Sequence, residues 1–307
     1  MRELWVTKYR PTKINEYVFR DEAQKSQVTS WLEGGTIPHL LFSGSAGTGK
    51  TTLAKVLLNE LGVDEGDILF INASVNNGVD WIRDNITNFA TTMPFGDFKY
   101  VFLDEGDYLS HNAQAALRGV MERYDNFCRF IITCNYPHKI IEAIHSRSQG
   151  FHIEKLDKVE YTARVAEILI AENVEFELEV LDLFVAAEYP DMRKCINLCQ
   201  QNAQTGTLLR PHVEDLGASD YKVEMIALFR AGKIAEARKL ICNKASLDEY
   251  EEIYRHMYEN LQYWGEESEI QKQAVIIIRN ALVNHVAIAD AEINLSACCI
   301  ELELLSM

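Results

Sequence analysis

The sequence predicts an α/β domain, with a parallel sheet covered by helices on both faces, followed by two helical domains. Over the first 150 residues, short and nearly continuous apolar runs alternate with helical patterns, which is typical of parallel strands buried on both faces. After about residue 152 only helical patterns follow, and glycine, proline and serine between residues 206 and 220 indicate a boundary. We therefore expect domains at residues 1–152, 153–217 and 218–307.

Four apolar runs predict the strands of the sheet. They lie at residues 39–43, 68–71, 100–103 and 130–134, and each gives way to a glycine-rich or polar segment. Ligands of parallel sheets bind at the carboxyl ends of the strands. The segments that follow the runs are therefore expected to form the site.

Helical spacing of apolar residues predicts the other elements. In the first domain the clearest helix covers residues 51–61, directly after a glycine-rich turn. The rest of the chain is expected to form helices at 157–173, 177–187, 191–205, 223–231, 234–241, 247–263, 269–286 and 289–304.

Composition describes an ordinary globular chain. Of its 307 residues, 48% are hydrophobic and 25% are charged, the usual mix for a protein with a core. No apolar run approaches the roughly 18–20 residues needed to span a bilayer, and the N-terminus lacks the apolar stretch of an export signal, so we expect a cytoplasmic protein without membrane contact. Seven cysteines without framework spacing indicate reduced thiols, and Cys195 and Cys199 are interpreted as packing residues rather than metal ligands.

Negative charge is concentrated in the second half of the chain. The net charge of −16 divides into −3 for residues 1–150 and −13 for residues 151–307. Binding of nucleic-acid phosphates needs local positive charge. The second half is therefore not expected to be a general nucleic-acid surface, whereas the first half can hold a local basic stripe.

A phosphate-binding loop is predicted from Gly44 to Thr51. The segment consists of glycine, four residues and Gly-Lys-Thr, after an apolar run and before a helix, which is the context that this motif requires. Glycines let backbone N–H groups turn toward phosphates at a helix N-terminus. Lys50 is expected to reach the β- and γ-phosphates of ATP, and Thr51 to place its hydroxyl on Mg²⁺. The residues expected to hold the nucleotide here are Gly47, Thr48, Gly49, Lys50, Thr51 and Thr52.

Hydrolytic residues are predicted at the ends of the next two strands. Asp104 is placed to hold Mg²⁺, and Glu105 to orient and deprotonate the attacking water. Asn135 ends the following run, and its amide can orient that water or touch the γ-phosphate if the two strands are neighbours. Taken alone, the acidic pair would be the start of a surface turn, and Asn135 a turn residue.

Two arginines are candidates for contacts with the γ-phosphate. Arg147 follows a short helix-like stretch and lies well beyond the strand ends of its own pocket, so an arginine-finger role would place it at a neighbouring subunit's ATP. Arg193 falls on the first turn of a helix that begins near Pro190, from which it could close the second domain over the nucleotide. A solvated surface position is the alternative for both.

In these motifs the chain resembles the clamp-loader ATPases of the AAA+ family, in particular replication factor C small subunits. The short length and the weaker match of the last hundred residues look most like the ATPase subunit of a T-even-type bacteriophage clamp loader. Departures from the family pattern are Gly106 in the Asp-Glu-Ala-Asp box, Ser148 in place of cysteine and Gly119 in place of a second arginine. The segments that match, in family order, are residues 5–11, 44–51, 72–74, 104–107, 114–118, 132–135, 146–147 and 191–193.

The resemblance implies an architecture and a reaction cycle. The fold would be an AAA+ P-loop ATPase domain, a small helical lid and an all-α collar that holds subunits in a ring-like arc, with other copies of this chain and a non-identical clamp-loader subunit as partners. ATP binding, with Mg²⁺, would open or hold open a sliding clamp. Primer–template DNA would then trigger hydrolysis and release of the loaded clamp, in the cytoplasm of a host if the phage affiliation holds.

The resemblance also implies roles that spacing alone does not supply. Arg147 would act in trans, Arg193 would be a second sensor, and Asn72 would be a switch that restrains Glu105 until DNA binds. Further implied residues are Val6, Thr7, Lys8, Tyr9 and Val18 beside the adenine, and Asn77, Arg83 and Arg118 against DNA.

Other functions stay open on the sequence alone. Another AAA+ DNA motor, such as a branch-migration helicase, would have a basic C-terminal winged-helix domain, against which the net charge of −13 argues. A nucleotide-dependent assembly switch would not need both Glu105 and Arg147. A small-molecule P-loop kinase is more remote, because its lid arginines would lie in the same domain.

Overall fold

The computed structural model describes residues 3–210, 221–285 and 290–305. They divide into two compact units, the first formed by residues 1–172 and 188–197 and the second by residues 173–187 and 198–307. The expected boundary after residue 152 falls within the first unit, and the expected boundary after residue 217 lies outside the described residues. The division into three domains therefore stays a prediction.

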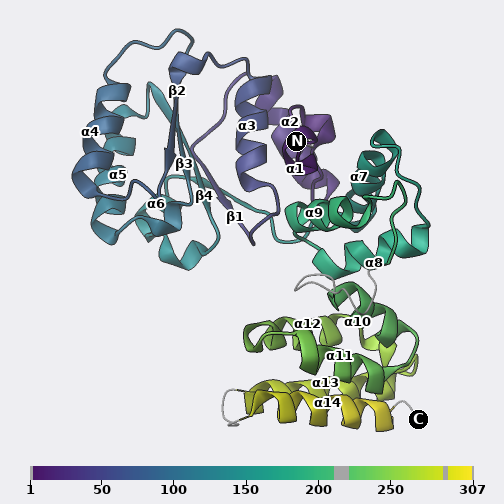
Figure 1. Ribbon diagram of the computed structural model, residues 1–307. Coiled ribbons are helices and arrows are strands. Elements are labelled where there is room, and N and C mark those ends of the chain that lie inside the picture. The colour runs from purple at the N-terminus through teal and green to yellow at the C-terminus, as the bar shows by residue number, and fades with distance from the viewer. Residues whose placement is uncertain (1–2, 211–220, 286–289, 306–307) are drawn as a thin grey trace. The chain divides into compact units, whose positions relative to one another are not determined.

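The first unit contains a five-stranded parallel sheet with the order β2-β3-β4-β1-β5 (Figure 1). The four predicted apolar runs form β1 to β4. The fifth strand was not predicted, because it is an edge strand in which only Phe151 is buried. The strands are β1 Leu40–Ser43, β2 Ile68–Asn72, β3 Lys99–Asp104, β4 Cys128–Cys134 and β5 Gln149–His152.

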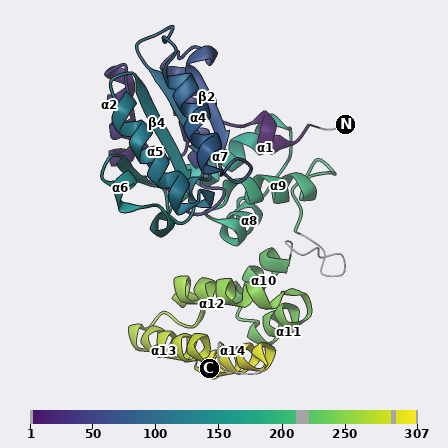
Figure 2. The ribbon, with the colours of Figure 1, turned by 90° about the vertical axis from the view of Figure 1, so that its left-hand side faces the viewer.

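Helices cover both faces of this sheet, which confirms the predicted α/β architecture. Helices α4 and α5 pack on one face and α2 and α3 lie on the other (Figures 1 and 2). Alternate residues of the strands meet α4 and α5 in one apolar core, which includes Ile71, Leu103 and Ile132 from the sheet. The helices of the first unit are α1 Trp5–Lys8, α2 Glu22–Glu33, α3 Lys50–Glu60, α4 Val79–Ala90, α5 His111–Tyr124, α6 Glu142–His145, α7 Lys158–Ala171 and the first part of α9 Met192–Asn202.

The second unit is helical, as predicted. The helix expected at 247–263 is divided in two places, because short 3₁₀ turns at Leu247–Glu249 and Leu261–Tyr263 flank α12. Among the described residues no helix is both long and apolar enough to cross a membrane. The elements are α8 Leu178–Glu188, the end of α9, α10 Tyr221–Arg230, α11 Ile234–Lys244, α12 Tyr250–Glu259, α13 Ser268–His285 and α14 Ala291–Leu305.

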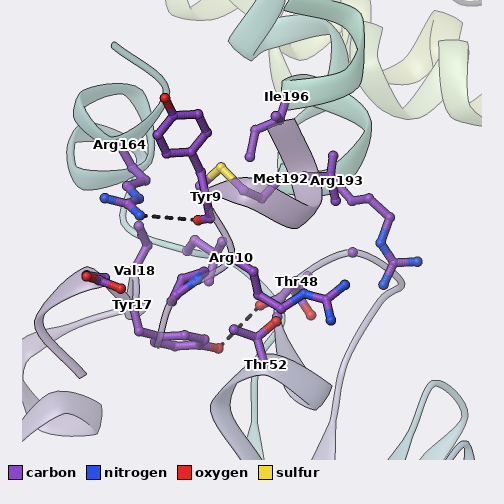
Figure 3. Close-up of a pocket in the computed structure, with 16 residues that line it drawn as sticks. Tyr9, Arg10, Tyr17, Val18, Thr48, Thr52, Arg164, Met192, Arg193 and Ile196 are labelled. Atoms are coloured by element: carbon purple, nitrogen blue, oxygen red, sulfur yellow. Dashed lines mark hydrogen bonds between the residues drawn. The ribbon is translucent and has the colours of Figure 1, made fainter. Parts of the chain in front are cut away.

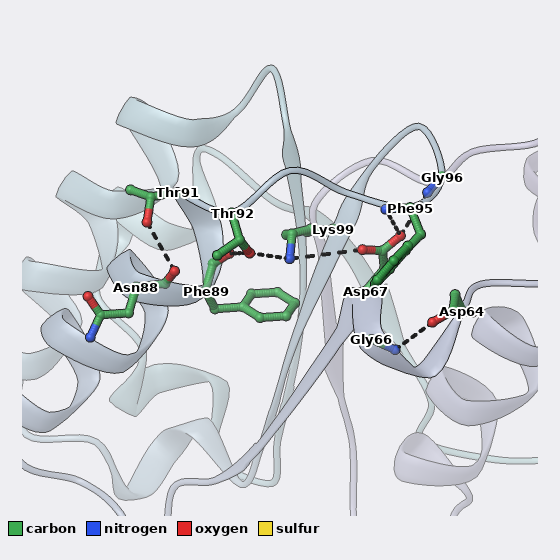
Figure 4. Close-up of polar contacts among 10 residues, drawn as sticks. All are labelled: Asp64, Gly66, Asp67, Asn88, Phe89, Thr91, Thr92, Phe95, Gly96 and Lys99. Atoms are coloured by element: carbon green, nitrogen blue, oxygen red, sulfur yellow. Dashed lines mark hydrogen bonds and ion pairs between the residues drawn. The ribbon is translucent and has the colours of Figure 1, made fainter.

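A buried ion pair closes the amino ends of β2 and β3 (Figure 4). The Lys99 ammonium lies 3.9 Å from Asp67 Oδ1 and donates a hydrogen bond to Thr92 Oγ1, and both charged side chains are at most 4% exposed. Asp67 Oδ2 accepts hydrogen bonds of 2.8 Å from the backbone N–H groups of Phe95 and Gly96. The pair therefore ties the loop before β3 to the sheet, at the end opposite the phosphate-binding loop.

Candidate functional site

The phosphate-binding loop joins β1 to α3, as predicted. Gly47 and Gly49 adopt positive φ angles of 74° and 91°, a backbone conformation that glycine adopts without a steric penalty. α3 begins at Lys50 with Gly49 at its N-cap. Its unpaired N–H groups and helix dipole therefore favour an anion at the loop.

The Lys50 ammonium is turned onto this loop. Its Nζ donates hydrogen bonds to the carbonyl oxygens of Gly44 at 2.9 Å and Ser45 at 2.7 Å. Burial lowers the pKa of Lys50 below its ordinary value of 10.5. A phosphate anion beside the ammonium would favour its charged form, so the lysine is prepared for a triphosphate.

A chain of hydrogen bonds joins the ends of β3 and β4 to α3. Thr51 Oγ1 donates to Asp104 Oδ1 at 2.8 Å, and Thr133 Oγ1 donates to the same oxygen at 2.6 Å. Thr133 Oγ1 in turn accepts from the backbone N–H of Glu105 at 3.0 Å. Sequence analysis missed Thr133, because a threonine within an apolar run is typical of any strand.

These oxygens fit a Mg²⁺ site. Thr51 and Asp104 supply one hydroxyl and one carboxylate on adjoining elements. Mg²⁺ in nucleotide sites usually takes one or two protein oxygens and completes its shell with phosphates and water. Among the described residues there is no group of three or more histidine, cysteine or acidic side chains that could hold a metal alone.

Glu105 sits in a strained conformation at the carboxyl end of β3. Its φ angle of 58° is left-handed, which costs a non-glycine residue about 1–3 kcal/mol and is commonest at functional sites. The following residue, Gly106, packs tightly, because a Cβ atom there would lie 2.6 Å from Ile132 Cγ2. The alanine usual in this motif would not fit without a shift.

β3 and β4 are neighbours, so the condition set for Asn135 is met. Asn135 lines the phosphate end of the pocket, and its backbone N–H donates to Asp107 Oδ1 at 3.4 Å. The full lining here is Ala46, Gly47, Gly49, Lys50, Thr51, Thr52, Asp104, Glu105, Thr133, Cys134, Asn135 and Arg193.

A second, more apolar compartment adjoins the phosphate end (Figure 3). Val6, Tyr9 and Val18 are among the residues that line it. Thr7 and Lys8 are not among its lining residues. The lining of this compartment also includes residues that sequence analysis did not assign, namely Arg10, Pro11, Glu16, Tyr17, Leu156, Arg164, Met192 and Ile196.

The N-terminal segment is held at this pocket by contacts with α7. Lys8 Nζ and Tyr9 Oη donate hydrogen bonds of 2.7 and 2.8 Å to Glu172 Oε1. The hydrogen bond from Lys8, followed by that from Tyr9, holds the pKa of Glu172 below its ordinary value of 4.5. The Arg164 guanidinium donates to the Tyr9 carbonyl oxygen at 3.3 Å.

The start of α9 contacts the phosphate-binding loop within the first unit. A Cβ atom at residue 47 would lie 1.8 Å from Asp191 Oδ1, so any other residue there would require the carboxylate to move. The same carboxylate oxygen accepts from the Lys194 N–H at 3.0 Å, at the N-terminus of α9. Arg193, two residues into the helix, lines both compartments.

Arg147 lies outside the lining of both compartments of its own chain. Its guanidinium is bonded to the Glu122 carboxylate, to the Ala143 carbonyl oxygen at 2.7 Å and to Ser146 Oγ at 3.2 Å. In this conformation the guanidinium is engaged by α5 and α6 and does not contribute to the pocket of its own chain.

The predicted switch and DNA-contact residues lie elsewhere on the first unit. Asn72 ends β2 beside Asp104, and its side-chain oxygen accepts from the N–H and hydroxyl of Ser74 at 2.9 and 2.6 Å. In the part of the chain that the structure describes, no hydrogen bond joins Asn72 to Glu105. Exposed Asn77 precedes α4.

The two arginines predicted to face DNA are exposed but have acidic neighbours. Arg83 on α4 lies 2.8 Å from Asp80 and 3.6 Å from Asp84. Arg118 on α5 lies 3.9 Å from Glu122. Their roles at DNA stay predictions.

Comparison with known proteins identifies similar chains. The family described as "ATPase family associated with various cellular activities (AAA)" matches residues 40–155. A replication factor C small subunit of Methanococcus maripaludis is 39% identical over 251 residues, which cover 79% of each chain. The one from Methanocella arvoryzae is 35% identical over 271 residues, which cover 84% of each chain.

Solved structures support the same fold. The Thermotoga maritima RuvB Holliday junction branch migration motor superimposes with a TM-score of 0.56 and 17% sequence identity over 80% of each chain. At this low identity the likeness concerns architecture alone.

Proposed function

Since this chain belongs to the family of replication factor C small subunits, we propose that it couples ATP turnover to the loading of a sliding clamp onto primer–template DNA. It is an ATPase subunit of a clamp loader. In the proposed cycle ATP binding opens or holds open the clamp, and DNA triggers hydrolysis and release. Partners are the clamp, further copies of this chain, a non-identical subunit and DNA.

Within one subunit, the described side chains divide the work on ATP. Lys50 leaves the loop carbonyls to bind the β- and γ-phosphates, while Val6, Tyr9 and Val18 border the adenine; Thr7 and Lys8 support that segment. Thr51 and Asp104 would hold Mg²⁺, which supplies charge neutralisation at the phosphates when bound. Glu105 orients and deprotonates the attacking water, Asn135 positions it, and Arg193 senses the γ-phosphate.

The observation that carries the proposed trans mechanism is the position of Arg147. The pocket has a lysine, an acidic pair and an asparagine, but Arg147 lies outside it on the surface of the same unit. An arginine that stabilises transition-state charge in trans contributes roughly 10³–10⁵-fold in phosphoryl transfer. We propose that Arg147 completes the site of an adjoining subunit in the arc.

Two variants with complementary defects test this mechanism. Lys50→Ala should not bind ATP productively but still donates Arg147, whereas Arg147→Ala binds ATP but donates no arginine. Each should be nearly inactive alone with clamp and primed DNA, and mixing them should restore ATP turnover. An unrestored mixture, or Arg147→Ala protein that is as fast as the parent, would contradict hydrolysis in trans.

DNA stimulation is proposed to act through Asn72 and the surface residues Asn77, Arg83 and Arg118. Contacts with the backbone of the duplex would be independent of sequence and weakened by salt. An Arg83→Ala, Arg118→Ala double variant is expected to lose DNA-stimulated turnover as salt rises and to keep basal turnover. Full stimulation at high salt would contradict the assignment.

We also propose a T-even-type bacteriophage origin, and thus a location in the host cytoplasm. The weaker match of the last hundred residues to the family pattern supports it. A phylogenetic tree that includes phage and archaeal subunits tests it. A position within the archaeal branch would contradict the proposal.

A further inference from the structure

The Arg147 guanidinium donates three hydrogen bonds, although its side chain is 35% exposed. The guanidinium has five N–H groups. Nη1 donates to the Ala143 carbonyl oxygen and to Ser146 Oγ, and Nη2 donates to the Glu122 carboxylate. Among the described residues no partner is recorded for the Nε–H or for the second N–H of Nη2, so these two N–H groups stay available to a phosphate oxygen.

Two of these three partners come from the short segment that carries Arg147 itself. Ala143 and Ser146 belong to α6 and its C-cap. Only Glu122 reaches Arg147 from another element, α5, 25 residues away in sequence. Glu122 is thus the contact that fixes the guanidinium relative to the rest of the ATPase unit.

Helix α5 is itself firmly placed. Near its start the buried Gln114 side chain donates to the carbonyl oxygens of Leu109 and Lys139 and accepts from the Ile141 N–H. These bonds join α5 to the segments that follow β3 and precede α6. At the other end of α5, Glu122 makes the second connection to α6.

Arg118 supplies an internal comparison. It lies one turn before Glu122 on α5, with Nε 3.9 Å from the same carboxylate oxygen. That separation is an ion pair without a hydrogen bond, whereas Arg147 is directly bonded. The carboxylate is therefore oriented toward Arg147.

We propose that Glu122 is a positioning residue that aims Arg147 at the γ-phosphate of the adjoining subunit. This inference rests on the proposed trans mechanism. The Glu122 and Arg147 side chains are 47% and 35% exposed, so their pair contributes little to folding stability. Its effect lies in the orientation of a group whose misplacement by about 1 Å can cost on the order of a hundredfold in rate.

The test places the substitution only in the subunit that donates the arginine. Lys50→Ala protein serves as donor and Arg147→Ala protein as the ATP-binding acceptor, mixed with clamp and primed DNA. Adding Glu122→Ala to the donor should lower the restored kcat about tenfold and leave KM for ATP unchanged, because the acceptor's pocket is intact. Glu122→Gln, which keeps a hydrogen-bond acceptor, should lose less.

A matched control is Glu142→Gln in the donor. Glu142 is an exposed carboxylate on α6 with no ion pair recorded among the described residues, and it should leave the restored rate unchanged. If the Glu122→Ala donor restores turnover as well as this control does, the positioning role is wrong while hydrolysis in trans stands. If the unmodified donor restores nothing, the trans mechanism fails and the role of Glu122 fails with it.

Discussion

Replacing Thr133 with valine should remove the hydrogen-bonded connection between Asp104 and Glu105 at the carboxyl end of β3. The Thr133 hydroxyl donates to Asp104 Oδ1 at 2.6 Å and accepts from the Glu105 N–H at 3.0 Å. Valine keeps the branched shape but can do neither. The Glu105 N–H, in a left-handed conformation, would be left without its acceptor.

The magnitude follows from the two bonds. A hydrogen bond to a charged group contributes about 1.5–3 kcal/mol, and an unsatisfied buried N–H costs about 1–3 kcal/mol. Thr133 borders the open phosphate compartment, so water can replace part of this loss. We therefore expect a local free-energy loss of about 2 kcal/mol, or roughly thirtyfold in an opening equilibrium.

Amide hydrogen exchange at Glu105 measures this directly. Exchange of that amide should rise about thirtyfold in Thr133→Val, and kcat for ATP should fall at least tenfold. Thr133→Ser is the control, because it keeps the hydroxyl and should stay close to the parent in both measurements. Equal protection of Glu105 in the valine and serine variants would refute the role assigned to this hydroxyl.

Three further predictions concern the surroundings of the site. Glu172→Gln should raise KM for ATP by about three- to tenfold in steady-state assays and leave kcat unchanged, because the N-terminal segment loses its hydrogen bonds to a charged carboxylate. An unchanged KM would contradict this. Burial lowers the pKa of His39 to about 4. Between about pH 6.5 and pH 4 the imidazole is therefore neutral in the folded protein, whereas in the unfolded protein it binds a proton. The free energy of unfolding should therefore fall by at most roughly 3 kcal/mol as the pH falls from 6.5 to 4. In His39→Asn, the urea midpoint of unfolding should depend less on pH over this range. Gly106→Ala should lower the free energy of unfolding by about 1–3 kcal/mol, and with it the unfolding temperature, because the added methyl group overpacks against Ile132. An unchanged unfolding temperature would contradict this expectation.

The sheet could be predicted because its central strands are buried on both faces. Runs such as residues 100–103 contain only apolar side chains, and each lies within a strand. The edge strand β5 escaped prediction because three of its four residues are exposed. The division of residues 247–263 was also missed, since apolar spacing continues through the 3₁₀ turns that flank α12.

The residues that line the phosphate end of the site could be predicted from the sequence, whereas most of those that line the more apolar compartment could not. Lys50, Thr51 and Asp104 lie on a local motif or at a strand end, so sequence position fixes their place. The contact between Lys8 and Glu172 joins residues 164 positions apart, which no local pattern reveals. Arg164 also lines the pocket only because α7 packs on the N-terminal segment, which is distant in the sequence.

The contact between Gly47 and Asp191 links the shape of the phosphate-binding loop to the position of the first turn of α9. There is no space for a methyl group between Gly47 and the Asp191 carboxylate, so a shift of the Gly47 backbone toward α9 would displace this carboxylate. Asp191 directly precedes α9 and accepts the Lys194 N–H, and Arg193 is the second residue of that helix. A change in the shape of the loop would therefore be felt at the start of the helix that carries Arg193.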